Sequence, residues 1–405
     1  MTAWLLVTAG LLAQPVIRPT LAGIVVDSKG TPVSGARVDV STAAPKAGPG
    51  VFCPSCYLDC AKWARTDPQG RYLIAGLDPT LKFRVLISAP GKKSQLSPLT
   101  DPLAGPLDVA LADLPKDVPP EQLLLGEVVD EQGTPIEGAL VEPEGAKTAE
   151  RRWWGTVEVD PAVTDSEGRF TLFLPPGYQG LDVSVFADGH AGTQAELLAP
   201  GAKRHRVAVP TGTRVVGRLV HVGMRMSGIQ IAVVQMDRSA GGHFIKAVAA
   251  TSDSEGRFAI DYLPADQDYA LFSVAGEGPQ PLVLTTKKFK AYASGKERDL
   301  GDLELIPALR LAGRVELPTG AIFPPHAKIV LSRDPAWDLI AAPLAEDGRF
   351  EFGGLPPESY TIRVTVGGVR LSSDKLKYQQ LDAASFGLRL RESVTDLRIP
   401  LELVR

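Results

Sequence analysis

Short stretches in which apolar and polar residues alternate recur along the whole chain of 405 residues. One set of four resembles one another in pattern: Phe83–Ile87, Leu181–Val185, Tyr269–Phe272 and Tyr360–Val364. A second set follows further along the chain: Leu107–Leu111, Arg206–Val209, Leu303–Ile306 and Leu397–Leu401. A period of two residues predicts strands with one buried and one solvated face, as in antiparallel sheets.

A polar turn precedes each stretch of the first set. It reads T-D-P-Q-G-R-Y from Thr66, T-D-S-E-G-R-F from Thr164, S-D-S-E-G-R-F from Ser252 and A-E-D-G-R-F from Ala345. The acidic side chain can accept hydrogen bonds from the turn backbone, and the glycine can adopt a positive φ. The aromatic residue after G-R is predicted to be the first inward-facing residue of the next strand. Calcium binding by the acidic residues Asp165, Glu167, Asp253 and Glu255 is the alternative interpretation.

The spacing of these turns sets the domain organisation. Their glycines stand at positions 70, 168, 256 and 348, in steps of 98, 88 and 92 residues. One small sandwich per repeat fits this period. We therefore predict an all-β protein of four tandem Greek-key or prealbumin-like β-sandwich domains of about seven strands each. The predicted boundaries are 20–113, 114–210, 211–308 and 309–405, after a signal peptide at 1–19.

A further motif opens each repeat. Ala22–Val38 and Leu125–Val141 share G-x-V-V-D-x-x-G-T-P-[VI]-x-G-A-x-V, and repeats three and four keep looser copies. Together with T-D-x-x-G-x-[FY] and the G-L-x-P turn, this motif resembles the carboxypeptidase regulatory-like domain, a relative of transthyretin-like and Cna-B-like sandwiches. The resemblance implies secreted or cell-envelope proteins in which such domains are spacers, adhesive stalks or carbohydrate-associated modules. It implies no catalytic residue.

The N-terminus favours export. Trp4–Ala13 is an apolar stretch with the length of a signal-peptide core, too short to span a bilayer. A first buried strand is the alternative. We expect the mature protein to be secreted, periplasmic or on the cell surface, without a membrane span.

Composition and motifs exclude several function classes. Lys+Arg 43 against Asp+Glu 47 gives a net charge of −4, too balanced for a nucleic-acid binder. The five histidines form no H-E-x-x-H pair, and neither a nucleophile elbow nor a phosphate loop occurs. We therefore expect a non-enzymatic monomer with no catalytic residue, no metal and no cofactor.

The three cysteines stand in one cluster, Cys53, Cys56 and Cys60. Converging thiolates can hold a metal, but this cluster lacks a fourth ligand. In an exported protein, one local disulfide with a spare thiol is the favoured interpretation.

Tryptophans gather where the repeats vary most. Trp63, Trp153, Trp154 and Trp337 fall between the opening motif and the polar turn of their repeats, and Arg151 and Arg152 adjoin two of them. Variable loops on a fixed scaffold often carry binding residues, and tryptophan faces suit sugar rings or protein hot spots. Packing of these rings over the ends of the sandwich cores is the alternative. A basic run, Lys203–Arg206, reads as a solvated strand edge or as a contact for an anionic polymer.

The sequence thus predicts a non-catalytic, structural or adhesive stalk that presents variable loops to a partner. The alternative is a carbohydrate-binding protein that uses the loop tryptophans. Possible partners are a polysaccharide or an envelope protein.

Overall fold

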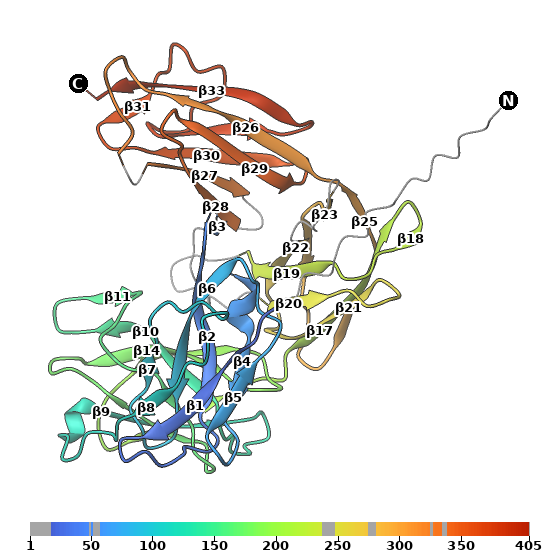
Figure 1. The fold of residues 1–405 in the computed structure, drawn as a ribbon. Coiled ribbons are helices and arrows are strands. Elements are labelled where there is room, and N and C mark those ends of the chain that lie inside the picture. Colours follow the sequence, from blue (N-terminus) through green and yellow to red (C-terminus); the bar gives the residue numbers. More distant parts are fainter. Residues whose placement is uncertain are drawn as a thin grey trace.

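The computed structural model describes residues 18–47, 50–51, 57–236, 248–273, 281–324, 327–333 and 338–404. These residues are mostly strands, with two short 3-10 helices as the helical elements of the described chain. In these same ranges the strands form eight sheets, which pair into four successive β-sandwiches. We number them sandwich 1 to sandwich 4 in chain order (Figure 1). The predicted class of all-β tandem sandwiches is confirmed.

Sandwiches 1 and 2 each consist of a three-stranded sheet facing a larger one, ordered β5-β1-β8 and β4-β2-β6-β7 in the first, and β13-β9-β16 and β11-β10-β14-β15 in the second. The elements of sandwich 1 are β1 (Leu21–Asp27), β2 (Arg37–Pro45), β3 (Gly50–Val51), η1 (Leu58–Ala61), β4 (Trp63–Arg65), β5 (Arg71–Ile74), β6 (Leu81–Ser88), β7 (Gln95–Leu96) and β8 (Val109–Leu111). Those of sandwich 2 are η2 (Pro120–Gln122), β9 (Leu123–Val129), β10 (Leu140–Lys147), β11 (Arg152–Trp154), β12 (Ala162–Val163), β13 (Arg169–Phe173), β14 (Gly180–Phe186), β15 (Thr193–Leu198) and β16 (Arg204–Ala208).

Sandwiches 3 and 4 each pair a four-stranded sheet with a five-stranded one and have longer closing strands, and the five-stranded sheet of sandwich 4 includes β3. Sandwich 3 contains β17 (Thr213–His221), β18 (Met224–Arg225), β19 (Gln230–Gln235), β20 (Val248–Thr251), β21 (Arg257–Leu263), β22 (Asp268–Ser273), β23 (Leu282–Leu284), β24 (Lys287–Lys290) and β25 (Glu297–Pro307). Sandwich 4 contains β26 (Leu309–Glu316), β27 (Lys328–Arg333), β28 (Asp338–Pro343), β29 (Arg349–Leu355), β30 (Ser359–Thr365), β31 (Val369–Leu371), β32 (Ser385–Arg389) and β33 (Val394–Leu403).

One strand pair in each sandwich departs from the antiparallel expectation. The first and last strands lie side by side and run parallel, as β1 does with β8 and β26 with β33. Because the chain crosses between the two sheets before it returns, the closing strand comes back in the direction of the opening one. This pairing ties the two ends of each repeat together.

Each sandwich has its own hydrophobic core. Four core clusters draw their residues from positions 21–111, 124–209, 215–305 and 311–401. These ranges fall inside the four predicted domains, whose boundaries remain a prediction. The aromatic residue after G-R is buried in every repeat, as predicted: Tyr72, Phe170, Phe258 and Phe350.

The polar turns have the predicted geometry. The Asp67 carboxylate accepts hydrogen bonds from the backbone N–H groups of Gln69 and Arg71 at 2.9 and 2.8 Å. The equivalent Asp165 and Asp253 do the same in their own turns. Gly168 has a φ of +70°, and a Cβ there would lie 2.5 Å from the Val128 carbonyl oxygen. Glycine is therefore required at this turn.

A buried hydroxyl joins two loops in three of the four repeats. Thr164 Oγ1 accepts the Ala139 N–H at 2.8 Å and donates to the Ile136 carbonyl at 2.6 Å. Thr66 and Ser252 make the same two bonds in sandwiches 1 and 3. The T-D and S-D pairs of the polar turns therefore carry a structural hydroxyl as well as a turn-forming carboxylate.

Acidification is expected to weaken sandwiches 1 and 2 through their first turns. Hydrogen bonds from the backbone N–H groups of Thr31 and Lys29 hold the pKa of Asp27 below its ordinary value of 3.8. The Thr134 N–H acts in the same way on the pKa of Asp130. A carboxyl group whose pKa is lowered by folding stabilises the folded state above its ordinary pKa. That stabilisation is lost as the pH falls through the lower, folded-state value.

Urea unfolding at a series of pH values tests this expectation. The urea concentration at the midpoint of unfolding should decrease as the pH is lowered below about 4. In the double variant Asp27→Asn, Asp130→Asn, the amide oxygen still accepts the bonds but does not titrate, so the fall should be smaller. Identical pH profiles for the two proteins would contradict this role of the carboxylates.

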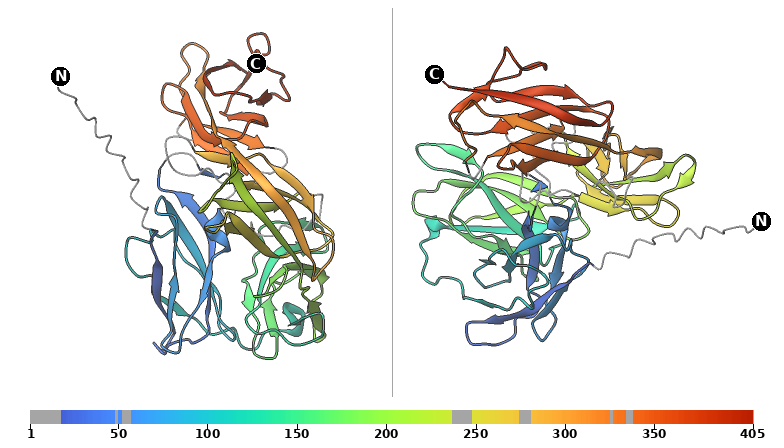
Figure 2. Two further views of the ribbon diagram at one scale, coloured as in Figure 1. Left: turned by 90° about the vertical axis from the view of Figure 1, so that its right-hand side faces the viewer. Right: turned by 45° about the horizontal axis from the view of Figure 1, so that its top comes forward.

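The four sandwiches are clustered rather than strung in a line. In Figure 2, sandwich 4, in orange and red, lies across one end of the molecule, and sandwiches 1 and 2, in blue and in cyan to green, lie at the other. Strand β3 of sandwich 1 pairs with β28 of sandwich 4, with Val51 opposite Ile340 and Gly50 opposite Ala341. Sandwich 1 therefore contacts the sandwich that is most distant from it in sequence.

Sandwiches 1 and 2 share a buried apolar contact. Leu86 of β6 packs with Leu140 of β10 and Val163 of β12, and Phe186 lies against the three of them. The Leu86 side chain belongs to this cluster and not to the core of its own sandwich. Side-chain burial therefore continues from one sandwich into the next.

A polar contact joins sandwiches 3 and 4. The Glu358 carboxylate accepts hydrogen bonds from Thr286 N–H at 2.5 Å and from Thr286 Oγ1 at 3.1 Å. The Arg333 side chain is buried, and its Nε lies 3.8 Å from Oε2 of Glu358. Its guanidinium lies 5.4 Å from the centroid of the Phe272 ring.

Candidate functional site

Trp63 on β4 is held by arginines of its own sandwich. The Arg37 guanidinium lies 4.3 Å from the ring centroid, and that of Arg65 lies 5.8 Å away. Arg37 also forms a buried ion pair with Asp39 at 2.9 Å. Both arginines donate to carbonyl groups of sandwich 2, Arg37 to Gly138 and Arg65 to the residue before it, each at 3.3 Å. The two arginines beside Trp63 are thus part of the contact between two sandwiches.

Trp153 is half-buried and packs against the core of sandwich 2. Its ring meets Tyr178 edge-on at 5.7 Å between centroids, and its indole N–H donates to the Thr156 carbonyl at 3.3 Å. The Arg151 guanidinium lies over the ring at 4.6 Å. These contacts correspond to the core-covering alternative.

Trp154 is the most exposed of the three described tryptophans in the predicted site. Its side chain is 37% exposed, and Arg152 lies over it at 5.2 Å. Arg152 is itself held by the fully buried Asp182 at 2.8 Å and by Glu196 at 2.7 Å. Hydrogen bonds to Asp182 and then to Glu196 raise the pKa of the Arg152 guanidinium, which therefore stays charged. This leaves part of the Trp154 ring for a partner.

The structure describes only some of the remaining predicted residues. Cys53, Cys56 and Trp337 lie outside the described residues, as do residues 1–17 of the predicted signal peptide. Cys60 is buried in η1 and belongs to the core of sandwich 1. The disulfide and the alternative metal site remain predictions.

Among the described tryptophans, the structure therefore separates Trp63 from the other two. Trp153 and Trp154 follow each other on one hairpin, whereas Trp63 lies on another sandwich. In the described part of the chain, no group of three or more His, Cys, Asp or Glu side chains is arranged to hold a metal ion. The arginines beside the tryptophans bind the protein itself.

Replacing Arg37 by methionine is expected to loosen the surroundings of Trp63. The variant leaves the buried Asp39 carboxylate without its cation, and we expect a loss of about 2 kcal/mol in the free energy of unfolding. Without the guanidinium over its ring, Trp63 should also be quenched more strongly by acrylamide. Arg65→Met is the matched control, because Arg65 is exposed and lies farther from the ring. Equal quenching in both variants would contradict this account of Trp63.

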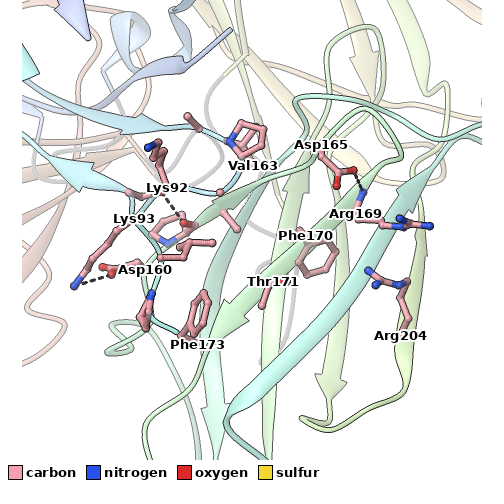
Figure 3. A pocket seen from close by; sticks show the side chains of 18 of the residues that line it. Lys92, Lys93, Asp160, Val163, Asp165, Arg169, Phe170, Thr171, Phe173 and Arg204 are labelled. Carbon is pink, nitrogen blue, oxygen red and sulfur yellow. Dashed lines mark hydrogen bonds and ion pairs between the residues drawn. The ribbon is translucent and has the colours of Figure 1, made fainter. Parts of the chain in front are cut away.

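Sequence reasoning missed a cleft between sandwiches 1 and 2. Its volume is about 490 Å³, and the loop of residues 89–94, the segment 158–163 and strand β13 supply most of its walls. Figure 3 shows Lys92 and Lys93 on one side and Thr171 and Arg204 on the other. No motif marks it, because its residues come from turns and outward-facing strand positions of two repeats. The sequence feature that could have indicated the cleft is the location of residues 158–163 in a segment that varies between repeats.

The comparisons with known proteins bear first on sandwich 1. Residues 20–112 match the family model of the carboxypeptidase regulatory-like domain, which confirms the resemblance predicted from the sequence motifs. No curated protein matches the chain at a significant level. The helices in the described part of the chain are too short and too polar to cross a membrane.

Three solved structures are similar to this chain at low identity. The Bacillus anthracis TIE protein is 12% identical, over 97% of this chain and 75% of its own, with a TM-score of 0.20. A streptococcal ancillary pilin is 13% identical, over 71% and 99%, with a TM-score of 0.26. A minor pilin of Streptococcus agalactiae is 12% identical, over 48% and 97%, with a TM-score of 0.22.

Proposed function

We propose that this chain is a non-catalytic structural protein, secreted or attached to the cell envelope, that serves as part of a stalk and presents loops to a partner. The main support for the proposal is that side chains of the variable loops contact other parts of the protein. Trp63 and Trp153 are held by arginine and tyrosine side chains of the protein, and the arginines around Trp63 bridge to the next sandwich. The loops serve first to hold the molecule together.

The contacts between sandwiches support the same proposal. The Leu86 cluster joins sandwiches 1 and 2, Glu358 joins sandwiches 3 and 4, and β3 joins sandwich 1 to sandwich 4. Flexible domains on a string would need none of these contacts. A stalk built from this chain would therefore be thick and stiff.

The family of the first sandwich supports an extracellular place for the protein. Carboxypeptidase regulatory-like domains are expected in secreted and envelope proteins as spacers or adhesive modules. Protease treatment of intact host cells carrying an epitope-tagged chain tests this proposal. Loss of the tag signal while a cytoplasmic marker stays intact would support it. A tag that is protected together with the cytoplasmic marker would overturn it.

The second candidate function is carbohydrate binding through the loop tryptophans. The partial exposure of Trp154 is the observation that favours it. Tryptophan emission and acrylamide quenching with a panel of polysaccharides distinguish the two candidates. Blue-shifted emission that no polysaccharide changes supports the structural function, and red-shifted emission protected by one polysaccharide supports the second.

A further inference from the structure

The cleft between sandwiches 1 and 2 exists only because the two sandwiches are packed together. Lys93 of sandwich 1 pairs with Asp160 of sandwich 2 at 3.3 Å between Nζ and Oδ2. Beside this pair, the Ser94 hydroxyl donates to the Pro161 carbonyl at 2.7 Å. These two bonds fix the position of one wall against the other. The volume of about 490 Å³ lies within the range of small-molecule sites, roughly 300–1,000 Å³.

The charges that line the cleft cancel almost completely. Lys92 is paired with Asp113 at 2.6 Å, Lys93 is paired with Asp160, and Arg169 is paired with Glu167. Three charged lining side chains remain outside these ion pairs: Arg204, Glu158 and Asp165, whose carboxylate accepts hydrogen bonds from the backbone of its own turn. A polyanion or a polycation would have to break these pairs, so the lining favours a ligand without net charge.

Polar groups with unused hydrogen-bonding capacity face this neutral space. Arg204 spends one N–H on the Gly126 carbonyl at 3.1 Å, and its other donors have no partner among the described residues. Within the same residues, the Thr171 hydroxyl and the Glu158 carboxylate make no hydrogen bond to the protein. The cleft thus offers a planar donor, a planar acceptor and a hydroxyl that can act as either.

An apolar surface lies next to these groups. The half-buried Phe173 ring and Pro161 line the same cleft (Figure 3). A sugar ring presents hydroxyl groups at its edge and C–H groups on its faces. A guanidinium and a carboxylate can each bond two neighbouring hydroxyls, while an aromatic face covers the C–H groups.

We propose that the cleft between sandwiches 1 and 2 binds a neutral oligosaccharide, with Arg204, Glu158 and Thr171 bonding its hydroxyl groups and Phe173 contacting a ring face. This proposal goes beyond the structural function and does not depend on it. It also places a sugar site away from the loop tryptophans.

Isothermal titration calorimetry of the full chain tests the proposal. The neutral probes are cellohexaose, xylohexaose, mannohexaose, maltohexaose and chitohexaose. The charged probes are a galacturonate hexamer and a heparin hexasaccharide, and an uncharged extended peptide is a further control. At least one neutral sugar is expected to bind, and Arg204→Gln and Glu158→Gln should each weaken its binding about tenfold.

Matched variants locate the site. Arg206→Gln makes the same change two residues along β16, on a side chain that pairs with Glu127 and does not line the cleft. It should leave the affinity within about twofold, as should Trp154→Ala. Arg204, Glu158 and Arg206 are exposed, so these variants should keep the wild-type melting temperature.

The proposal is overturned if no neutral sugar binds, or if only the charged probes or the peptide bind. It is also overturned if Trp154→Ala abolishes sugar binding while Arg204→Gln and Arg206→Gln have equal effects, because the site would then be the tryptophan hairpin. None of these outcomes bears on the location of the protein outside the cell, which the protease experiment tests.

Discussion

Replacing Thr164 by valine is expected to lower the free energy of unfolding of sandwich 2 by about 3 kcal/mol. Valine has almost the shape of threonine but has no hydroxyl. It leaves the Ala139 N–H and the Ile136 carbonyl without the partner that each has at 2.8 and 2.6 Å. Thr164 is fully buried, so water cannot replace the hydroxyl at low cost.

Chemical denaturation of Thr164→Val and Thr164→Ser measures this effect. Serine keeps both hydrogen bonds and loses only a methyl group, so its loss should be about 1 kcal/mol. Ser252 makes the same bonds in sandwich 3, which shows that serine fits the site. If the serine variant were as unstable as the valine variant, packing of the methyl group would explain the loss and the hydroxyl would not.

Replacing Leu86 by aspartate is expected to uncouple sandwich 1 from sandwich 2. The new carboxylate would face Leu140 and Val163, and an unpaired charge in such an apolar contact costs several kcal/mol. Separating the two sandwiches is the cheaper outcome, because Leu86 is not part of the core of its own sandwich. Sandwich 1 should stay folded.

Calorimetry of the full chain follows this separation. We expect sandwiches 1 and 2 to unfold in one transition in the wild type and in two transitions in Leu86→Asp. Leu73→Asp is the matched control, because Leu73 lies on the same sandwich and is 61% exposed. Thermograms of Leu86→Asp that coincide with those of the wild type would show that the Leu86 cluster does not couple the sandwiches.

The turns and strands of each repeat could be predicted from the sequence because local chemistry determines them. An aspartate two residues before the N–H it bonds, a glycine at positive φ and a following inward aromatic are all short-range features. The hydroxyl of Thr164 was overlooked. It was visible as T-D or S-D in three repeats, but its bonds reach 25 and 28 positions along the chain.

The candidate site was harder to predict, because the same residues allow opposite interpretations. A tryptophan beside an arginine fits a sugar platform and equally fits an internal cation–π contact. One feature of the sequence does indicate packing between the sandwiches. Val85, Leu86 and Ile87 are apolar in succession, and a strand that is apolar on both faces is buried on both sides. The cleft depends on how two sandwiches meet, and no short motif encodes that arrangement.

Small-angle X-ray scattering of the mature protein tests most directly whether the sandwiches form one packed body. The wild type should give the profile calculated from the clustered arrangement in Figure 2, without the signature of a flexible chain of domains. Leu86→Asp should give a larger radius of gyration. A wild-type profile of domains on a string, unchanged in Leu86→Asp, would contradict both the stiff structural role and the existence of the cleft.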